Sequence, residues 1–276
     1  MERHPYILTP DELRKLQMVL LEMLLELDRI CRKNNIRYVL DAGTMLGAVR
    51  HKAFIPWDDD IDIVMMREEY DRFREACVND LNPQKFFYQD HTTDPHYRWG
   101  YARIRRIGSE FVRVGQEHMK MKTGIFLDIF PRDNVPDSKA LRIWHNFYCF
   151  LLRKIQYAEI GKLSAKRISQ RAAYRLIGMI SIAFVFRRLD KLAAIWNRKP
   201  TTLVRTLTFP ILSSARYGYK REWFEDTIVV EFEGHVFPGM RHYDEFLTCL
   251  YGDYMSLPPE NKRHWHPVSA FKLPDV

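Results

Sequence analysis

The sequence of 276 residues is poor in cysteine and contains no long apolar run, and each shortage excludes a class of protein. The four cysteines lie far apart without a C-x-x-C pair, so neither a disulfide framework nor a cysteine-paired zinc site is expected. No stretch approaches the roughly 20 apolar residues that a membrane-spanning helix needs. The first residues, MERHPYILTPDEL, lack the apolar h-region of a signal peptide. We therefore expect a cytoplasmic protein with reduced thiols.

Basic residues are concentrated in one part of the chain. The formal net charge is +8, yet residues 142–199 hold thirteen Lys and Arg against two acidic residues, so the remainder is slightly acidic. A patch this local indicates an anionic partner more clearly than the overall pI does. The segment shows no nucleic-acid-binding module. We therefore expect no nucleic acid among the partners, although a basic nucleic-acid-binding protein stays an alternative to an enzyme.

The order of expected helices and strands indicates a mixed α+β fold with a hydrophobic core, since 46% of the residues are hydrophobic. A capping box at Thr9 and Glu12 begins an N-terminal helix, which Asn34-Asn35 ends. Further helices are expected at 44–51, 67–80 and 241–254, with two or three more within 139–200. Strands are expected at 36–43, 60–66, 86–90, 101–106, 110–114 and 124–130, and a hairpin at 226–237 turns at Glu233-Gly234. Pro131 and Pro136 mark a loop that contains Asp133.

The segment LDAGTMLGAVRHKAFIPWDDDIDIV, residues 40–64, places four aspartates within five positions. Side chains at i and i+2 of a strand share a face, so Asp58, Asp60 and Asp62 are expected on one side of the strand. Like charges this close repel each other unless a cation compensates them. Carboxylate oxygens suit Mg²⁺ or Mn²⁺, which also bind phosphate. The alternative is a solvated acidic turn at the start of a strand.

A glycine pair precedes this cluster and indicates a phosphate-binding loop. Gly43 and Thr44 follow a strand directly, and Gly47 comes one helical turn later. Glycines at a strand-to-helix junction let backbone amides approach an anion, and the helix N-terminus favours negative charge. Arg50 can neutralise a phosphate oxygen, or it can form a surface salt bridge with the aspartates.

Three further sets of polar residues are candidates. Asp128 lies in the apolar stretch GIFLDIF, where a carboxylate is costly to bury unless it is paired or metal-bound. It is either a third acid of the metal site or a structural residue. Arg103 and Arg105 share a strand face and can hold an anionic acceptor. His264 and His266 are spaced like metal ligands, but no carboxylate partner is evident, so we favour a tail that contacts phosphate.

The blocks GTMLGAVRHKAFIPWDDDIDI, REEYDRF, GIFLDIFPRD and YDEFLTCLYGDYMSLPP together resemble the LicD family, which includes bacterial phosphocholine transferases and the fukutin-related proteins. The resemblance implies a nucleotidyltransferase-type domain at residues 35–259, with an N-terminal helix at 1–34, a basic helical insertion at 139–200 and a tail at 260–276. By that resemblance Asp60 and Asp62 are the catalytic metal ligands, with Asp58 beside them. The segment from Gly43 to Gly47 is then the nucleotide-phosphate loop.

The family resemblance also implies an activity. It points to a magnesium- or manganese-dependent transfer of phosphocholine, or a related phospho-alcohol, from a CDP-linked donor such as CDP-choline. The acceptor implied is a hydroxyl of a glycan or lipid-linked glycan, as in lipopolysaccharide or teichoic acid. A nucleotide-sugar glycosyltransferase is the alternative enzyme. The run Leu176–Phe186, flanked by Arg187 and Arg188, either lies at an anionic membrane surface on the cytoplasmic side or belongs to the core.

Overall fold

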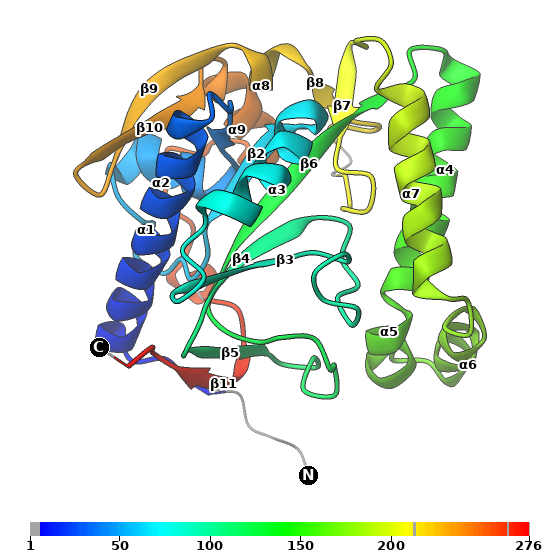
Figure 1. Ribbon diagram of the computed structural model, residues 1–276, viewed down its shortest axis with the longest axis horizontal. Helices are drawn as coiled ribbons and strands as arrows, with labels where there is room; N and C mark the ends of the chain where they lie inside the picture. Colours follow the sequence, from blue (N-terminus) through cyan, green and yellow to red (C-terminus); the bar gives the residue numbers. More distant parts are fainter. Residues whose placement is uncertain (1–5, 212–213, 264, 276) are drawn as a thin grey trace.

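The computed structural model describes residues 6–211, 214–263 and 265–275, and these form a mixed α+β structure (Figure 1). The helices are α1 (Pro10–Lys33), α2 (Ala42–His51), α3 (Arg67–Asp80), α4 (Lys139–Gln156), α5 (Ala158–Ser164), α6 (Ile168–Ile177), α7 (Ile182–Trp196), α8 (Glu222–Glu225) and α9 (Tyr243–Tyr251), with a 3-10 turn η1 (Glu260–Lys262). The strands are β1 (Val39–Leu40), β2 (Asp62–Met66), β3 (Phe86–Gln89), β4 (Ala102–Arg106), β5 (Glu110–Arg113), β6 (Phe126–Val135), β7 (Leu203–Arg205), β8 (Tyr219–Lys220), β9 (Thr227–Phe232), β10 (His235–Met240) and β11 (Val268–Lys272).

The N-terminal helix begins and ends where the sequence indicates. The Thr9 side chain accepts from the Glu12 amide at 3.2 Å, and Glu12 Oε2 accepts from the Thr9 amide at 2.8 Å, which confirms the capping box. Leucines at helical spacing along α1 are buried in the main core, and Asn34 caps the C-terminus. The helix α1 therefore covers one side of the central sheet together with α3 (Figure 1).

The central sheet has seven strands and brings two chain segments into parallel register. Its main order is β1-β2-β6-β4-β3, and β7 and β8 extend it from the far part of β6. The strands β2 and β6 are parallel, with Asp62 opposite Asp128, whereas the other pairs are antiparallel. Ile63 and Ile129 are also opposite each other and fully buried. The polar pair and the apolar pair therefore occupy opposite faces of the same two strands.

The strand β6 is longer than the sequence indicates. It runs from Phe126 through Pro131 to Val135, so the expected loop at Pro131 and the placement of Asp133 in it are wrong. On one edge of β6, the pairing with β4 stops at Ile129 and the pairing with β7 begins at Asp133. Pro131 lies in the interval between these partners, where its missing N–H costs little.

The basic segment 139–200 contains four helices rather than the two or three expected. The helices α4 and α7 stand side by side beyond β7, with α5 and α6 at one end (Figure 1). They share a second hydrophobic cluster that includes Cys149, Leu152, Phe186 and Leu189. The two ends of the run Leu176–Phe186 differ in exposure, because Phe186 is buried in the second cluster whereas Leu176 is 69% exposed. Neither alternative for this run holds along its whole length.

The segment after residue 260 is more than a tail. Its strand β11 pairs antiparallel with β5, and Val268 is fully buried in the main core.

The β9–β10 hairpin turns at Glu233-Gly234 as expected, with both residues at positive φ. The four cysteines are free thiols. Within the described residues, no helix combines the length and the apolar character that crossing a bilayer would require.

Candidate active site

The aspartate cluster lies in the turn that leads into β2, not on the face of a strand. The strand starts only at Asp62, so the expectation that Asp58, Asp60 and Asp62 share a strand face is wrong. The Asp58 amide donates to the Ile55 carbonyl at 2.9 Å, which turns the chain before the strand. The three carboxylates still lie within electrostatic reach of one another: burial raises the pKa of Asp62 most, and the charges of Asp60 and Asp58 add to the rise. Turn geometry rather than strand alternation gathers them.

The pairing of three strands places Asp128 beside Asp62. Asp128 is opposite Asp62 on β2 and opposite Arg103 on β4, so the three side chains point to one face of the sheet. Arg103 Nε donates to Asp128 Oδ1 at 2.5 Å, and both side chains are buried. Arg103 is thus committed to Asp128, and its guanidinium also lies 3.8 Å from the Phe126 ring centre. Asp128 has the partner that its structural alternative expects, and it also adjoins the cluster, so its role as a third acid of the metal site stays a prediction.

The N-terminus of α2 lies next to the aspartates. Its N-cap, Asp41, makes no side-chain capping bond to the helix, so the first-turn amides stay available. A Cβ on Gly43 would lie 3.0 Å from Asp58 Oδ2, so the backbone approaches this carboxylate closely. Thr44 Oγ1 accepts from the Asp62 amide at 2.9 Å and ties α2 to the start of β2. These contacts place Gly43 and Thr44 at the candidate site.

Gly47 and Arg50 have other neighbours. A Cβ on Gly47 would lie 2.6 Å from the Ala53 carbonyl oxygen, so this glycine permits the chain after α2 to fold back closely. Arg50 Nη1 donates to the Tyr254 carbonyl at 2.7 Å and holds the segment after α9. Arg50 forms no ion pair with the aspartates in the described part of the chain, which removes that alternative, and its contact with phosphate stays a prediction.

The charge balance of the cluster is compatible with a divalent cation. Burial, and then the nearby Asp60 and Asp59, raise the pKa of Asp58 well above its ordinary value. Burial, and then Asp60 and Asp128, do the same for the pKa of Asp62. Among the described residues, no ion pair includes Asp58 or Asp62, whereas Asp60 has Arg113 at 2.9 Å. Two carboxylates with water and substrate phosphate oxygens make the shell that Mg²⁺ prefers.

A second group of ligands, which the sequence interpretation missed, lies beside the first. His266 Nδ1 is 2.8 Å from Asp59 Oδ1 and 3.6 Å from Asp60 Oδ2. Ligand atoms of these three residues lie within 4.8 Å of one another, an arrangement that can hold a metal ion. The expectation that His266 has no carboxylate partner is therefore wrong. His264 lies outside the described residues.

Three cavities lie beside the aspartates or beside the arginines that pair with them, and their linings differ. The first, about 450 Å³, lies at the start of α2 and includes Gly43, Arg50, Trp57 and Asp58. The second, about 390 Å³, is basic and is lined by Arg103, Arg113, Arg153 and Lys154 with the aromatic rings of Trp99, Tyr101 and Tyr157. The third, about 230 Å³, is aromatic and touches Asp41 and Asp62. We call them the loop pocket, the basic pocket and the aromatic pocket.

Arg105, the other expected anion ligand, is not free to bind an anion. Its Nε donates to Gln89 Oε1 at 2.6 Å and its Nη1 to the Gly124 carbonyl at 2.7 Å. Burial lowers the pKa of Arg105 to about 9. Its guanidinium therefore joins β4 to β3 and to the segment just before β6. The expectation that Arg103 and Arg105 together hold an anionic acceptor is wrong for Arg105.

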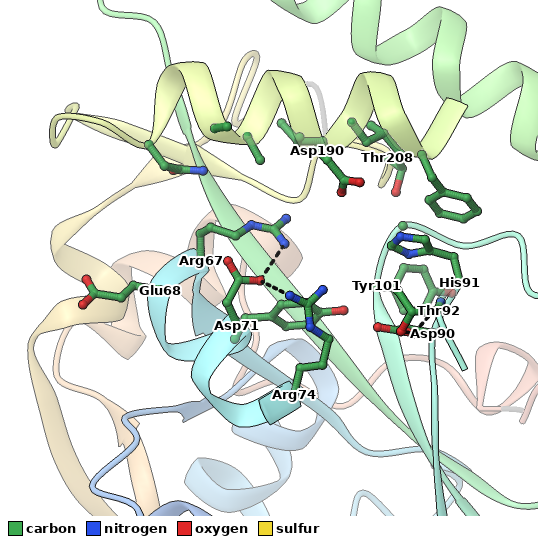
Figure 2. A pocket seen from close by; sticks show the side chains of 18 of the residues that line it. Arg67, Glu68, Asp71, Arg74, Asp90, His91, Thr92, Tyr101, Asp190 and Thr208 are labelled. Carbon is green, nitrogen blue, oxygen red and sulfur yellow. Dashed lines mark hydrogen bonds and ion pairs between the residues drawn. The ribbon is translucent and has the colours of Figure 1, made fainter. Parts of the chain in front are cut away.

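A fourth cavity, about 640 Å³, lies apart from the aspartate cluster, between α3 and α7 (Figure 2). Its charges compensate one another, because Asp71 lies between Arg67 and Arg74, at 3.7 and 3.8 Å. His91 stacks on Phe186 of α7, with ring centres 4.0 Å apart. This cavity shares Tyr101 and Thr208 with the basic pocket, so the two are neighbours.

Comparisons with known proteins agree with the resemblance read from the motifs. The model of the LicD/FKTN/FKRP nucleotidyltransferase domain matches residues 35–157. The lipopolysaccharide cholinephosphotransferase LicD of Haemophilus influenzae is 30% identical over 262 residues, which are 93% of this chain and 96% of that protein. An uncharacterised protein of Rickettsia prowazekii is 30% identical over 149 residues, 54% of this chain and 49% of its own length. One from Rickettsia typhi is 41% identical over 61 residues, 22% and 20% of the two chains.

Proposed function

Since the chain belongs to the LicD family and is a transferase, we propose that it transfers phosphocholine from a CDP-linked donor to a hydroxyl of a lipopolysaccharide glycan. The similarity to the Haemophilus influenzae cholinephosphotransferase along nearly the whole of both chains supports the group transferred and the acceptor. The observation that carries this proposal is the pair Asp58 and Asp62, two carboxylates that have no cationic partner among the described residues and that lie beside the uncapped N-terminus of α2.

The proposed metal ligands are Asp60 and Asp62, with Asp58 beside them. Asp60 binds Arg113 through Oδ2, so Oδ1 is the Asp60 oxygen that would face the ion. A Mg²⁺ or Mn²⁺ ion bound there would polarise the phosphoryl oxygens of the donor and neutralise charge as the phosphate is transferred. The first-turn amides of α2, at Gly43 and Thr44, would bind the nucleotide phosphates. The loop pocket next to them, with Trp57 at its wall, is then the site of the cytidine.

Asp128 is proposed to accept the proton of the attacking hydroxyl. The acceptor oxygen forms a bond to the phosphorus of the phosphocholine group, the bond from that phosphorus to the CMP oxygen breaks, and the hydroxyl proton passes to an Asp128 carboxylate oxygen. Arg103 holds Asp128 from the side of the basic pocket. The cations of that pocket suit a glycan that carries phosphate groups, so we place the acceptor there.

The test is a transfer assay with purified protein, CDP-choline and lipopolysaccharide that lacks phosphocholine, read by mass spectrometry. We expect transfer that requires Mg²⁺ or Mn²⁺ and stops with EDTA. Asp60→Asn and Asp62→Asn should each lower kcat by about a thousandfold, since a metal ion supplies several kcal/mol of transition-state stabilisation. Asp11→Asn, on the exposed side of α1, is the control. Full Mg²⁺-dependent turnover in both site variants would overturn the metal assignment.

We also propose that the protein contacts an anionic membrane surface on the cytoplasmic side through α4. This helix buries His145, Cys149 and Leu152, and the opposite side, which is usually polar, is apolar. Five large side chains there are each 40–57% exposed, and we call them the outer face of α4: Ile143, Trp144, Phe147, Phe150 and Leu151. Aromatic and aliphatic residues beside basic ones are typical of helices that lie in a membrane interface.

The positive charge of residues 142–199 indicates which kind of partner binds the outer face of α4. Residues 142–199 carry thirteen Lys and Arg against two acidic residues, so two copies placed face to face would repel each other. Arg153 and Lys154 lie 5.6 and 5.3 Å from the Phe150 ring centre, at the edge of the outer face. Anionic lipid headgroups attract such residues while the apolar side chains enter the interface.

A further inference from the structure

The aromatic pocket lies directly beside Asp62 and has an unusual combination of linings. It is enclosed by β2, β6, α9 and the segment 206–211, and six of its residues matter here: Asp41, Asp62, Phe130, Phe209, Tyr219 and Tyr251. The ring centres of Phe130 and Phe209 are 5.1 Å apart, and the ring planes meet at 67°. The pocket thus offers aromatic surfaces and two carboxylates, of which Asp62 is also a proposed metal ligand.

One of these carboxylates has an oxygen without a partner. Asp41 Oδ2 accepts from Arg132 Nη2 at 2.7 Å, whereas Asp41 Oδ1 is buried and accepts no hydrogen bond from any described residue. Arg132 also donates to Thr206 Oγ1 at 2.8 Å, and its guanidinium lies 4.7 Å from the Phe224 ring centre. Arg132, the one cation among the described residues of the lining, is therefore paired with Asp41, and Asp41 Oδ1 is the carboxylate oxygen that stays free when Asp62 binds the proposed metal ion.

The other two cavities at the site are less suited to a cation. The basic pocket has four cationic side chains, which would repel it. The loop pocket also has rings and carboxylates, at Trp57, Tyr254, Asp58 and Asp253, but it adjoins the first-turn amides of α2 and includes Arg50, and these groups favour anions. Of the three cavities, the aromatic pocket alone has a carboxylate in its lining, Asp41, with a buried oxygen that no described residue bonds.

We propose that the aromatic pocket binds the quaternary ammonium group of the donor's choline. This assignment rests on the proposed function, in which the donor carries phosphocholine. A quaternary ammonium ion has no N–H to donate, so it is held by aromatic faces and by charge rather than by hydrogen bonds. The pocket supplies both, and its contact with Asp62 lets the phosphate of the same donor reach the metal site.

The test compares variants of the pocket in binding and in turnover. Phe209→Leu removes a ring and keeps the apolar surface, and it should weaken phosphocholine binding and raise the KM for CDP-choline about tenfold. Leu250→Lys, on α9, places a cation at a position that lines the aromatic pocket alone of the three, and it should have a larger effect. Leu250→Met is its control. Tyr157→Leu controls for the basic pocket, which Phe209 also lines.

Phosphocholine and tetramethylammonium binding is measured by calorimetry, with thermal melting to verify that each variant is folded. Wild-type protein should bind both probes and prefer phosphocholine to phosphoethanolamine. Unchanged binding and unchanged KM in folded Phe209→Leu and Leu250→Lys would overturn the pocket while the transferase activity stands. Protein that binds tetramethylammonium at this pocket but transfers no phosphocholine would overturn the function and leave the pocket as a quaternary-ammonium site.

Discussion

Asp128 and Asp133 lie in one strand and have different partners. Asp128 binds Arg103 beside the aspartate cluster, whereas Asp133 is fully buried and receives Nε and Nη2 of Arg67, both at 2.7 Å. Asn197 Nδ2 adds a third bond to Asp133 at 2.7 Å, which fixes α7 to β6. Asp128 therefore belongs to the candidate site, whereas Asp133, five residues later, joins β6 to α3 and α7.

We expect Asp128→Asn to lower kcat far more than Asp133→Asn when both variants are fully folded. Asp133→Asn should instead lower the free energy of unfolding by about 3 kcal/mol, because it leaves Arg67 with an incomplete partner in a buried pair. Urea unfolding gives the stability, and kcat is measured at a temperature where circular dichroism shows both variants native. An equal loss of kcat would mean that Asp128 is a structural residue.

Local spacing predicts some of the site residues and cannot predict others. The D-D-D-I-D pattern identified the aspartate cluster, because charge repulsion between near neighbours is visible in the sequence itself. The partner of Asp59, His266, is 207 residues away, so no spacing relates them. Arg113 reaches Asp60 only because β11 holds β5 in place. Contacts of this kind depend on the tertiary fold and need the structure to be seen.

At the scale of the elements, α2 separates two roles that the sequence assigned to one loop. Gly43 lies in the first turn, against Asp58, whereas Gly47 packs against the Ala53 carbonyl. The glycine pair correctly predicted that a helix begins beside the aspartate cluster. It did not reveal that Gly47 serves packing, because a G-x-x-x-G spacing is the same for a phosphate loop and for a close backbone approach.

We expect Gly47→Ala and Gly43→Ala to have opposite signatures. A Cβ at Gly47 would meet backbone at 2.6 Å, so the variant should lose about 1–3 kcal/mol of unfolding free energy. A Cβ at Gly43 would meet only the Asp58 carboxylate, at 3.0 Å, so this variant should unfold like wild type and bind CDP-choline more weakly. Thermal unfolding and calorimetric titration separate the two, and weaker donor binding in a stable Gly47→Ala variant would contradict the division.

The elements that the sequence predicted correctly are those with strong local signals. The capping box, the leucine spacing of α1 and the Glu233-Gly234 turn are each contained within a short window. The sequence prediction ended β6 too early, because a proline disfavours a strand on local grounds. Pro131 is tolerated there because it lies in the interval between the partners β4 and β7. The four helices of 139–200 have no strong stop signals, so their number was underestimated.

Over the whole molecule, charge and exposed apolar surface coincide in the helical segment. The protein carries +8, and residues 142–199 supply more positive charge than that total. The outer face of α4 lies in this same segment, at the edge of the molecule away from α1 and the β9–β10 hairpin (Figure 1). An enzyme whose proposed acceptor is a glycolipid would gain from this arrangement, because a membrane contact keeps it near the acceptor.

We expect Trp144→Gln with Phe147→Gln to weaken binding to anionic liposomes by about 3 kcal/mol, more than a hundredfold, since two large side chains no longer enter the interface. Arg187→Glu with Arg188→Glu should weaken it by roughly 4 kcal/mol if both arginines lie at the surface, as each basic residue there contributes about 1 kcal/mol and each reversal counts twice. Neither change should alter nucleotide or metal binding.

Sedimentation with vesicles that contain phosphatidylserine, at low and high salt, measures both effects. Val229→Gln with Val236→Gln is the matched control, because these valines are 74% and 55% exposed on the β9–β10 hairpin, outside the basic segment. The control should sediment like wild type. The charge variant should lose its difference from wild type as salt rises, since screening removes the attraction, whereas the aromatic variant should stay weaker at every salt concentration. Wild-type protein that does not sediment with these vesicles even at low salt would refute the membrane contact and leave the outer face of α4 to a protein partner.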